Sequence, residues 1–464
     1  MAEPVTGPVT RPLGAALTAS VPVPLWLDNP DRPEPRPPLR EDTEADLVVV
    51  GGGFTGLWTA LRALERDPTC RVVLVEAERI AEHATGRNGG FCEASLTHGE
   101  ANGRQRWPGE HDVLDRLGRE NLDALEATLD RYGIDCGFER RGVLTVATRA
   151  HQVAGLEPGR EGFLDGRAVR AALDSPTYLA GRLDRDEGAT LDPARLAWGL
   201  ARAAESLGAV VAERTRVQQL RHARGRVHVV TEHATVSAAR VVLATNVFTS
   251  LLRQRRLLVV PVYDHVLATE PLTSGQLEAL GWHDRFGVTD SGNQFHYYRL
   301  TPDDRILWGG YDAVYHYGRS IDPAHEERAA SFELLARHFA ETFPQLDGIR
   351  FTHRWAGVID TCTRFCAFFG VTGRGRVGYA AGFTGLGVGA SRFAADVLLD
   401  LLGGEDTERT RLRMVRTRPL PFPPEPFAWL GITVTRWAMA REDRTGRRGP
   451  WLRLLDRCGL GFDS

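Results

Sequence analysis

The stretch that decides the fold of this chain is Val48-Val49-Val50-Gly51-Gly52-Gly53-Phe54-Thr55-Gly56. Three β-branched residues lead directly into the spacing Gly51-x-Gly53-x-x-Gly56, and apolar residues then recur at helical spacing as far as Leu64. A strand, a tight glycine turn and the start of a helix are the parts of a dinucleotide-binding unit. Gly51 allows the turn, Gly53 lets a pyrophosphate approach the backbone, and Gly56 lets helix and strand pack closely.

A second strand strengthens this interpretation. Arg71-Val72-Val73-Leu74-Val75-Glu76 follows the helix and ends in an acid twenty residues beyond Gly56, where a carboxylate accepts hydrogen bonds from the ribose hydroxyls of an adenosine. The N–H groups of Phe54 and Thr55 begin the helix, and the positive end of its dipole faces the phosphates. The alternative is a plain βαβ crossover whose glycines serve packing alone.

Composition narrows the classes of function. With 464 residues and 42% hydrophobic content the chain can bury a large core, and its formal net charge of −3 gives no basic face for nucleic acid. All 57 basic residues are arginine, so no lysine can act as a base or form a Schiff base. Without a signal peptide or a long apolar segment, and with six scattered cysteines, a reduced cytoplasmic protein with no integral membrane segment is predicted. Cys362-x-x-x-Cys366 lacks the second pair typical of a metal site, so we expect buried thiols and no metal.

Periodicity along the rest of the chain predicts an α/β protein. Residues 1–40 are proline-rich and are expected to form an extended arm. Helices are predicted at 116–132, 193–207, 326–343 and 391–402, and strands at 143–148, 209–211, 227–230, 235–236, 240–246, 259–269, 295–300 and 306–311. Asp192 and Pro193 are typical of the cap and the first position of a helix. The strands at 227–230 and 235–236 are interpreted as a small hairpin, separate from the buried strand at 240–246.

A second glycine-rich turn lies near the other end of the chain. Gly382-Phe383-Thr384-Gly385-Leu386-Gly387-Val388-Gly389 precedes the helix predicted at 391–402. Two such turns indicate a long cofactor held at both ends, whereas NAD needs only the first. Together with Gly86-Arg87-Asn88-Gly89-Gly90, Ala244-Thr245-Asn246 and Trp355-x-Gly357, they form a pattern that resembles the D-amino acid oxidase-like superfamily of FAD-dependent oxidoreductases. The segment at 86–90 and Phe295-His296-Tyr297-Tyr298-Arg299 look most like the gamma-glutamylputrescine oxidase branch.

The resemblance implies an α/β fold in which a Rossmann-like FAD-binding domain, of the glutathione reductase type, is interleaved with a β-rich substrate domain. The FAD-binding domain is expected at residues 41–110, 190–260 and 350–402, and the substrate-binding domain at 111–189 and 261–349. The arm at 1–40 and a C-terminal extension at 403–464 lie outside the resemblance. Segment 429–455 is expected to pack on the protein or on a second subunit, because arginines interrupt its short apolar stretches.

The resemblance also gives each motif a role toward FAD. Glu76 is expected to hold the adenosine ribose, the first glycine turn the pyrophosphate, and Val217 the adenine through its backbone. The segment at 87–90 passes beside the isoalloxazine ring, and the helix that begins at the second turn faces the flavin N1–C2=O edge. The residues expected to bind the cofactor are Gly51, Gly53, Phe54, Thr55, Gly56, Glu76, Arg87, Asn88, Gly89, Gly90, Val217, Thr245, Gly382, Thr384, Gly385, Gly387 and Val388.

The implied reaction oxidises the C–N bond of an amine to an imine by hydride transfer to flavin N5, after which the imine hydrolyses. The expected partners are a small-molecule amine and either O2 or another electron acceptor, and an oligomer is left open. Candidate catalytic residues are His296, Tyr298, Arg299 and Tyr311. Since alternate residues of a strand face opposite ways, one face of this strand is expected to meet the pocket.

Two positions depart from the family pattern. Ile359 stands where members that resemble glycine oxidase carry an arginine that clamps the substrate carboxylate, which favours an amine without an adjacent carboxylate. Arg299 or Arg364 could replace that clamp, so an N-substituted or cyclic amino acid is the alternative substrate. Trp308 stands near the place of the lysine that assists oxygen reduction in the sarcosine oxidase-like branch. A non-catalytic flavin-binding scaffold and an NAD dehydrogenase are the alternatives from other classes.

His83 bears on how the flavin is attached. The segment His83-Ala84-Thr85-Gly86 resembles the His-Ala-Ala-Gly segment of dimethylglycine dehydrogenase-like flavoproteins, whose histidine is bonded to the flavin 8α-methyl group. The Arg-Asn-Gly-Gly sequence that follows is instead typical of branches that hold FAD non-covalently. We therefore expect a non-covalent cofactor and a histidine at the surface.

Overall fold

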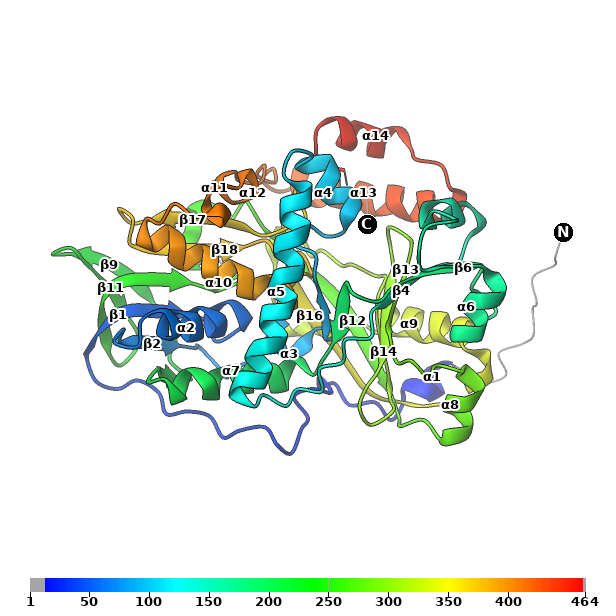
Figure 1. Cartoon of the computed structure of the whole chain (residues 1–464), viewed down its shortest axis with the longest axis horizontal. Helices are drawn as coiled ribbons and strands as arrows, with labels where there is room; N and C mark the ends of the chain where they lie inside the picture. The colour runs from blue at the N-terminus through cyan, green and yellow to red at the C-terminus, as the bar shows by residue number, and fades with distance from the viewer. Residues whose placement is uncertain (1–12, 249, 462–464) are drawn as a thin grey trace.

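The computed structural model describes residues 13–248 and 250–461, and its central feature is a largely parallel sheet (Figure 1). In spatial order the strands are β17 (Phe368–Thr372), β18 (Val377–Ala381), β11 (Thr235–Leu243), β1 (Thr43–Val50), β2 (Val72–Val75) and β8 (Val210–Ala212). β1 pairs in parallel with β2 and β11, whereas β17 runs antiparallel to β18. β10 (Arg226–Val230) and β9 (Gln219–Ala223) extend from β11 as an antiparallel ribbon.

The turn after β1 accepts only glycine at two positions. Gly51 has a φ of +115°, and a Cβ there would lie 2.4 Å from the carbonyl oxygen of Ala244. A Cβ on Gly56 would lie 1.9 Å from the carbonyl oxygen of Gly51. As the glycine spacing predicts, α2 (Phe54–Arg66) therefore lies close to the strand and begins at the carboxyl edge of the sheet.

Three long helices pack on this first sheet and a fourth crosses them. α2 lies between α7 (Pro193–Ser206) and α10 (Gly387–Gly403), and α5 (His111–Tyr132) crosses near α10 (Figure 1). The Asp192 side chain caps α7 by accepting from the N–H groups of Ala194 and Arg195, which confirms the predicted start of that helix. α10 begins a turn earlier than predicted, directly at the second glycine-rich turn.

A second, largely antiparallel sheet forms the other half of the molecule. Its strands, in spatial order, are β16 (Phe351–Thr361), β12 (Val260–Thr269), β15 (Ile306–Gly310), β14 (His296–Leu300), β13 (Gly287–Asp290), β4 (Val143–Ala147), β6 (Ala180–Asp184) and β5 (Phe163–Leu164). α9 (Ala329–Thr342) packs on β12 and β15. The same half contains α1 (Leu13–Leu17), α6 (Gly166–Ala172) and α8 (Ser274–Leu280) (Figure 1).

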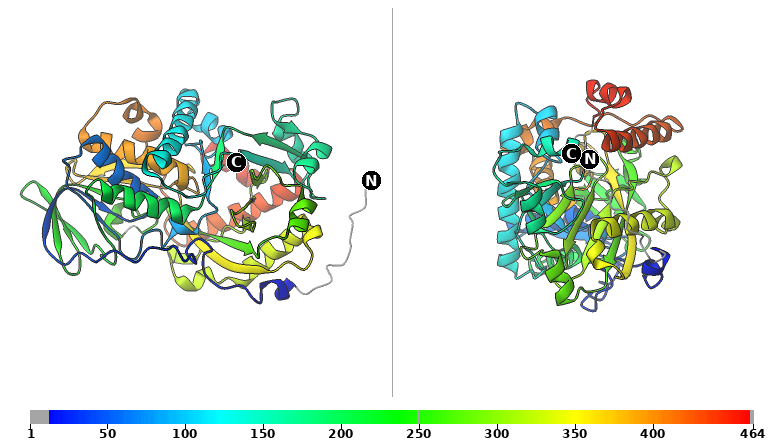
Figure 2. Two further views of the ribbon diagram at one scale, coloured as in Figure 1. Left: turned by 60° about the horizontal axis from the view of Figure 1, so that its bottom comes forward. Right: turned by 90° about the vertical axis from the view of Figure 1, so that its right-hand side faces the viewer.

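Shorter elements join the two halves. They are α3 (Ala84–Arg87), α4 (Glu100–Arg106) and a small sheet of β3 (Phe91–Glu93) and β7 (Gly188–Thr190). The C-terminal extension adds α11 (Glu408–Arg411), α12 (Arg413–Arg416), α13 (Phe427–Thr445) and α14 (Pro450–Arg457). In both Figure 1 and the right-hand view of Figure 2, α13 and α14 lie together along one edge of the molecule.

The strands differ from the prediction in several places, since β3, β5, β6, β7, β9, β16 and β17 were not predicted. β11 is one continuous strand, whereas a hairpin arm at 235–236 and a separate strand at 240–246 were expected. Its first half pairs with β10 and its second half with β18, so the two halves meet different neighbours on the same edge. β13 was not predicted, because Val288 is the only large apolar residue among its four.

The proline-rich arm is mostly extended, with the short α1 and a bridge from Val21 to His353, and residues 1–12 lie outside the described part. β16 belongs to the second sheet, although the range 350–402 was assigned to the FAD-binding domain. The division into domains at the expected residue ranges stays a prediction.

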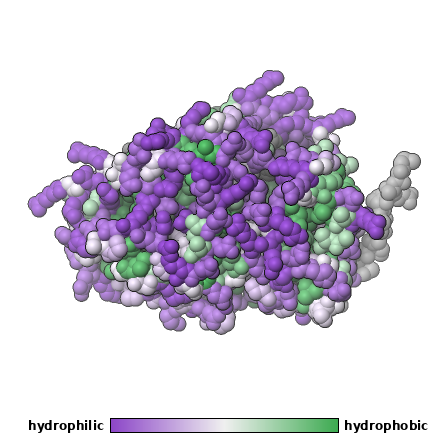
Figure 3. Space-filling view, viewed as in Figure 1, coloured by the Kyte–Doolittle hydropathy of each residue, from purple (hydrophilic) through white to green (hydrophobic). Residues whose placement is uncertain are grey.

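Apolar side chains gather in separate cores on the two sheets. The largest core contains the inner faces of α2, α5, α7 and α10, and another lies between the second sheet and α9. The outer face shown in Figure 3 is mostly hydrophilic, with small apolar areas. Within the described ranges, no helix is both long enough and apolar enough to cross a bilayer.

Candidate active site

A cavity of about 890 Å³ lies between the two sheets. Its lining comes from the carboxyl edge of the first sheet, where α2 and α10 begin, and from β12, β14 and β15 of the second sheet. Ligands of open α/β sheets bind outside this carboxyl edge. The cavity therefore brings together the two glycine turns, represented by Gly53 and Gly385, from opposite ends of the chain.

The first turn forms one end of the cavity. Gly53, Phe54 and Thr55 line it, and α2 begins at Gly53 without a side chain that caps its N–H groups. Free N–H groups at a helix start bind phosphate. A Cβ on Gly53 would lie 2.9 Å from the hydroxyl oxygen of Thr85, which accepts a hydrogen bond from the Phe54 N–H at 3.1 Å. A side chain at position 53 would thus displace Thr85, while the backbone of Gly53 itself faces the cavity, as a close phosphate approach requires.

Glu76 lies behind this turn and outside the cavity lining. Its two carboxylate oxygens accept hydrogen bonds from the N–H groups of Gly52, at 2.6 Å, and Glu78, at 2.8 Å. Burial raises the pKa of Glu76, partly offset by these two bonds. Each oxygen keeps a lone pair for another donor. The predicted bond from a ribose hydroxyl is thus sterically and chemically consistent, and it stays a prediction.

Several predicted cofactor residues also lie outside the described lining and act on the fold instead. Gly51 and Gly56 shape the turn, and the Thr245 hydroxyl donates to the carbonyl oxygen of Phe248 at 2.8 Å. Val217 packs beside a hydrophobic core near the strand that follows β8. Their predicted contacts with the adenosine part of the cofactor remain untested.

The segment from Arg87 to Gly90 is held by its own side chains. Asn88 donates through Nδ2 to the carbonyl oxygens of Ala84 and Thr85, and its Oδ1 accepts from the Gly90 N–H at 2.8 Å. Arg87 donates to the carbonyl oxygens of Glu82 and Ala356 and forms an ion pair with Glu326. Arg87, Asn88 and Gly89 line the cavity, whereas Gly90 does not. These bonds fix the backbone that faces the middle of the cavity.

The second turn forms the wall opposite this segment. Thr384, Gly385, Gly387 and Val388 line the cavity, and α10 begins without a side-chain cap. Gly382 lies just behind, where its N–H donates to the Asp360 carboxylate. Burial raises the pKa of Asp360 to about 7 despite the main-chain bonds that it accepts. An uncapped helix start facing a cavity stabilises negative charge on a bound group.

Asp264 and Tyr297 form a polar pair on the second sheet. The Tyr297 hydroxyl donates to Asp264 Oδ2, and both residues line the cavity. Burial raises the pKa of Asp264 to about 6, although hydrogen bonds from Tyr297 and from the main chain of Gly310 and His265 oppose this shift. Neither residue is among the catalytic residues predicted from the sequence. A carboxylate within the apolar strand Val260–Thr269 was the signal that could have indicated Asp264.

Of the four predicted catalytic residues, only Tyr311 lines the cavity. His296 lies one layer behind it, with its ring 4.9 Å from the ring of Tyr311 and hydrogen-bonded to Asp290 and His338. Tyr298 is fully buried in the core beneath the second sheet, where its hydroxyl bonds to that of Tyr178. Strand alternation turns Tyr297 to the cavity and its two neighbours away from it, so a direct contact of His296 or Tyr298 with substrate stays a prediction that the cavity lining does not support.

Arg299 and Arg364, considered as carboxylate clamps, are both structural. Arg299 is 1% exposed and donates to the carbonyl oxygens of Gly90 and Leu191, contacts that do not support its predicted catalytic role. Arg364 donates to the carbonyl oxygens of Ala367, Met414 and Thr417. Neither residue lines the cavity, whereas Ile359 does.

The remaining sequence candidates lie away from the cavity lining. Trp308 is fully buried against His296 and Tyr298. The Cys362 thiol donates to the carbonyl oxygen of Cys366 at 3.2 Å, and both cysteines are buried. His83 has a half-exposed side chain that lies 3.4 Å from the Glu78 carboxylate and packs on the ring of Phe248.

Two helices begin without side-chain caps at the carboxyl edge of the parallel sheet, and one cavity lies between this edge and the β-rich half. This arrangement is typical of a dinucleotide-binding oxidoreductase. Comparison with known families makes this specific: residues 46–401 match the FAD dependent oxidoreductase (DAO) family, so the chain belongs to that family. The resemblance found in the sequence is confirmed. The chain is an enzyme with FAD as its cofactor, and an NAD dehydrogenase is not supported.

Individual relatives agree with this assignment. The chain is 33% identical to gamma-glutamylputrescine oxidoreductase of Escherichia coli (strain K12), over 80% of this chain and 86% of that protein. It is 27% identical to Probable oxidoreductase OrdL of Haemophilus influenzae, over 80% and 85%. Among solved structures, glycine oxidase from Geobacillus kaustophilus has the same fold, with a TM-score of 0.68, 20% identity, and coverage of 81% of this chain and 99% of that one. The predicted Rossmann-like half interleaved with a β-rich half is thus confirmed.

The residues present fit FAD. The glycine at position 53 and the uncapped start of α2 leave room and donors for a pyrophosphate, and the uncapped start of α10 suits the anionic edge of a reduced flavin. The loop at 87–89 lines the same cavity. A dinucleotide with a flavin can therefore extend from one helix start to the other.

Proposed function

We propose that this enzyme oxidises the C–N bond of an amine that carries no carboxylate on the reacting carbon. The observation that carries the proposal is the charge of the cavity lining. Its arginines, Arg87 and Arg436, are each ion-paired, with Glu326 and Asp312 respectively. Its one histidine, His98, has a pKa lowered to about 4 by burial and is neutral.

Acidic groups in the lining point the same way. Glu93 and Asp264 both line the cavity, and burial raises the pKa of each. Among the described residues, no side chain pairs with the Glu93 carboxylate. A substrate ammonium is attracted to such groups, whereas a substrate carboxylate next to the reacting carbon would be desolvated without a cation, at a cost of several kcal/mol. Ile359, in place of an arginine, adds only apolar surface.

The bound flavin supplies hydride acceptance at N5. The chain has three tasks in this proposal. Asp264 takes the proton from the arriving ammonium, because hydride leaves from the neutral amine, and Tyr297 orients that carboxylate by its hydrogen bond. The cavity holds the reacting carbon and excludes bulk water, and the imine that leaves is hydrolysed to a carbonyl compound and a smaller amine or ammonia.

An N-substituted or cyclic amino acid is the second candidate substrate. It is favoured by one observation: Nε of Arg436, in the cavity wall, is buried without a hydrogen-bond partner among the described residues. The relative named gamma-glutamylputrescine oxidoreductase acts, by its name, on a putrescine derivative, which is consistent with the amine candidate. A scaffold without catalysis has no specific observation in its favour.

Matched substrate pairs under anaerobic conditions test the proposal. Butylamine and 2-aminopentanoate differ only by the carboxylate on the reacting carbon, and sarcosine and proline represent the second candidate. We expect loss of flavin absorbance with the amine at concentrations where 2-aminopentanoate has no effect. If sarcosine or proline reduces the flavin faster than butylamine does, and Arg436→Leu abolishes this reduction, the second candidate is established. Failure of every amine and amino acid in a broad panel would favour the scaffold.

The flavin is proposed to be held non-covalently. The half-exposed His83 is already in contact with Glu78 and Phe248, outside the cavity lining. Acid precipitation should release flavin to the supernatant, and a yellow pellet from the wild type but not from His83→Ala would establish covalent attachment instead. Oxygen or another acceptor re-oxidises the flavin, in a cytoplasmic protein whose six cysteines are unpaired.

A further inference from the structure

The C-terminal extension contributes a large part of the cavity wall. The family match ends at residue 401, yet α13 and α14 both line the cavity. On α13 the lining positions are Phe427, Ala428, Gly431, Ile432, Thr435, Arg436 and Met439, most of which recur at three and four residues and so form one helical face.

The opposite face of α13 points to solvent. Leu430 is 54% exposed and Trp437 is 61% exposed, and Thr433 between them is also exposed. α14 adds Trp451, Leu452 and Leu455 to the cavity wall. The inward positions of both helices are predominantly apolar, with Thr435 and Arg436 as the polar exceptions.

Specific bonds attach this wall to the substrate half of the molecule. The Asp443 carboxylate accepts from the N–H groups of Asn293 and Gln294, at 2.8 and 2.9 Å, directly before β14. Arg436 pairs with Asp312 at 2.6 Å, directly after Tyr311. Since β14 carries Tyr297, both attachments lie beside the residues that face the cavity from the second sheet.

The two helices are also fixed to each other and to the rest of the chain. The Trp451 indole N–H donates to the Thr435 hydroxyl at 2.9 Å, and Arg448 forms a two-bond pair with Asp456. Arg106 of α4 donates to the carbonyl oxygens of Gly459 and Gly461. Bonds at the middle and the end of the extension indicate a preformed wall.

We infer that residues 420–461 form a large apolar part of the substrate-binding chamber and select amines that carry an extended apolar group away from the reacting carbon. This inference rests on the proposed amine oxidation and names its substrate class. Each methylene buried against such a wall strengthens binding about fourfold. The polar pair of Asp264 and Tyr297 receives the amine end, and the extension receives the apolar end.

Ligands that cannot be oxidised separate binding from chemistry. Butyltrimethylammonium and octyltrimethylammonium lack the lone pair needed for hydride loss, and each can be titrated into the FAD-loaded enzyme while the flavin absorption spectrum is recorded. We expect the octyl ion to bind at least about tenfold more tightly than the butyl ion. Equal affinities would contradict the inference.

Gly431→Leu is the test variant, because a Cβ at this position meets nothing within 4 Å and leucine suits a helix. We expect the octyl ion to lose at least about tenfold in affinity while the butyl ion changes less than about threefold. Thr433→Leu adds the same side chain to the exposed face of the same helix and should leave both affinities unchanged. Ile432→Ala removes wall surface and should weaken octyl binding with little effect on butyl binding.

The outcomes separate this inference from the proposed function. If no amine reduces the wild-type flavin but the chain-length dependence and its loss in Gly431→Leu are found, the proposed reaction fails and the apolar wall stands. If amines do reduce the flavin but Gly431→Leu changes flavin reduction by octylamine and by butylamine equally, the inference about the apolar wall is overturned. Loss of flavin in both wall variants, with normal flavin in Thr433→Leu, would also overturn it, since the wall would then serve cofactor retention.

Discussion

Asp264 places a carboxylate in the middle of β12, a strand whose other residues are mostly apolar. Burial favours its neutral form and raises the pKa of Asp264 to about 6, from an ordinary value near 4. Below that pH the group is protonated and cannot accept a proton from an ammonium. Above it the group is ionised, so the proposed proton transfer should become faster as the pH rises through about 6.

The first prediction is that Asp264→Asn slows flavin reduction by an amine about 10²- to 10⁴-fold. The rise of the wild-type rate near pH 6 should disappear in this variant, as measured by anaerobic stopped-flow at several pH values. Tyr297→Phe keeps the carboxylate but removes the hydrogen bond that lowers its pKa. The midpoint should therefore shift upward in Tyr297→Phe. An unchanged profile in Asp264→Asn would assign the proton transfer to another group.

The second prediction concerns Arg299, which connects the flavin-facing loop to the strand before α7. Arg299→Met leaves the carbonyl oxygens of Gly90 and Leu191 without their donor, at a cost of about 1–3 kcal/mol for each unsatisfied group. We expect a lower thermal midpoint and faster loss of FAD, with equal effects on all substrates. Selective loss of activity on carboxylate-bearing substrates would restore Arg299 as a clamp.

Position 297 shows what the sequence could predict at the scale of a residue. The run from His296 to Arg299 indicated a strand with alternating faces, and β14 confirms it. Which face meets the cavity depends on the neighbouring strands and on the helix beneath them, and these are distant in sequence. Two adjacent tyrosines gave no means of choosing between Tyr297 and Tyr298.

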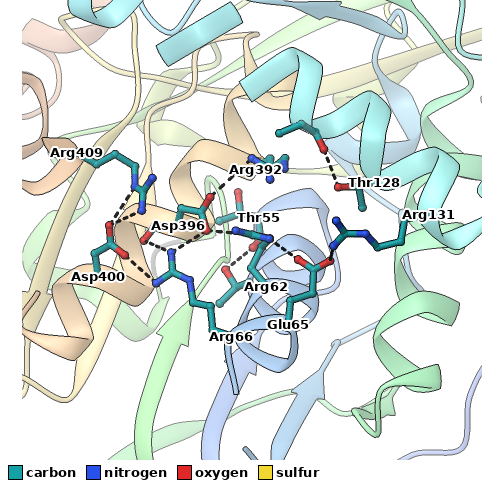
Figure 4. A network of polar contacts seen from close by, with 12 residues as sticks. Thr55, Arg62, Glu65, Arg66, Thr128, Arg131, Arg392, Asp396, Asp400 and Arg409 are labelled. Carbon is teal, nitrogen blue, oxygen red and sulfur yellow. Dashed lines mark hydrogen bonds and ion pairs between the residues drawn. The ribbon is translucent and has the colours of Figure 1, made fainter. Parts of the chain in front are cut away.

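At the scale of elements, α2 and α10 are joined by an ionic network (Figure 4). Arg66 of α2 pairs with Asp396 and Asp400 of α10, at 2.8 and 2.7 Å, and Arg62 pairs with Asp396 at 3.0 Å. Asp400 has no exposed side-chain area and also pairs with Arg409 at 2.9 Å. Because each helix begins at one glycine turn, this network fixes the separation of the two ends of the cofactor site.

The third prediction is that Asp400→Asn lowers the free energy of unfolding by about 2–3 kcal/mol. This is less than the loss of about 3–5 kcal/mol from breaking a fully buried pair, since Arg66 and Arg409 are partly exposed and can become hydrated. Denaturant titration of the FAD-free protein measures the change. Asp406→Asn removes one partner of an exposed pair with Arg411 and should have little effect. Equal effects of the two substitutions would contradict the structural role of the network.

Most elements with a clear period could be predicted from the sequence, whereas most short ones, and the long strand β16, could not. The strand-turn-helix unit, α5, α7 and α10 are confirmed because long apolar repeats define them. The prediction divided β11 into two strands because Ser237 and Arg240 interrupt its apolar pattern. In the structure both residues pair with neighbouring strands, so the strand is continuous. β13 has too few residues to show a period.

At the scale of the molecule, the two glycine turns could be assigned to one cofactor because each carries a local signal. The cavity wall formed by α13 and α14 could not be predicted. Its residues appear in the sequence as short apolar stretches interrupted by arginines, and only the folded chain shows which helical face meets the cavity. The charge balance of the lining depends in the same way on ion pairs between distant segments, such as Arg87 with Glu326.

The outer face of α13 leads to the last prediction, which concerns membranes. Leu430 and Trp437 are exposed on this face, and Arg441 and Arg444 follow them. Anchoring on an anionic bilayer needs both apolar insertion and a polybasic patch. Here the inward face of the helix already lines the cavity, Glu442 and Asp443 lie between the two arginines, and the whole chain has a net charge of −3.

We therefore expect the FAD-loaded enzyme to stay in the supernatant when it is sedimented with phosphatidylserine-containing liposomes at about 0.15 M salt. The short apolar stripe is then a contact for protein, and Trp437→Ser should leave the supernatant fraction unchanged. Sedimentation of the wild type that is lost in Trp437→Ser would show that α13 lies on the membrane surface. Sedimentation that persists in this variant would also contradict the prediction, with a membrane contact that does not need Trp437.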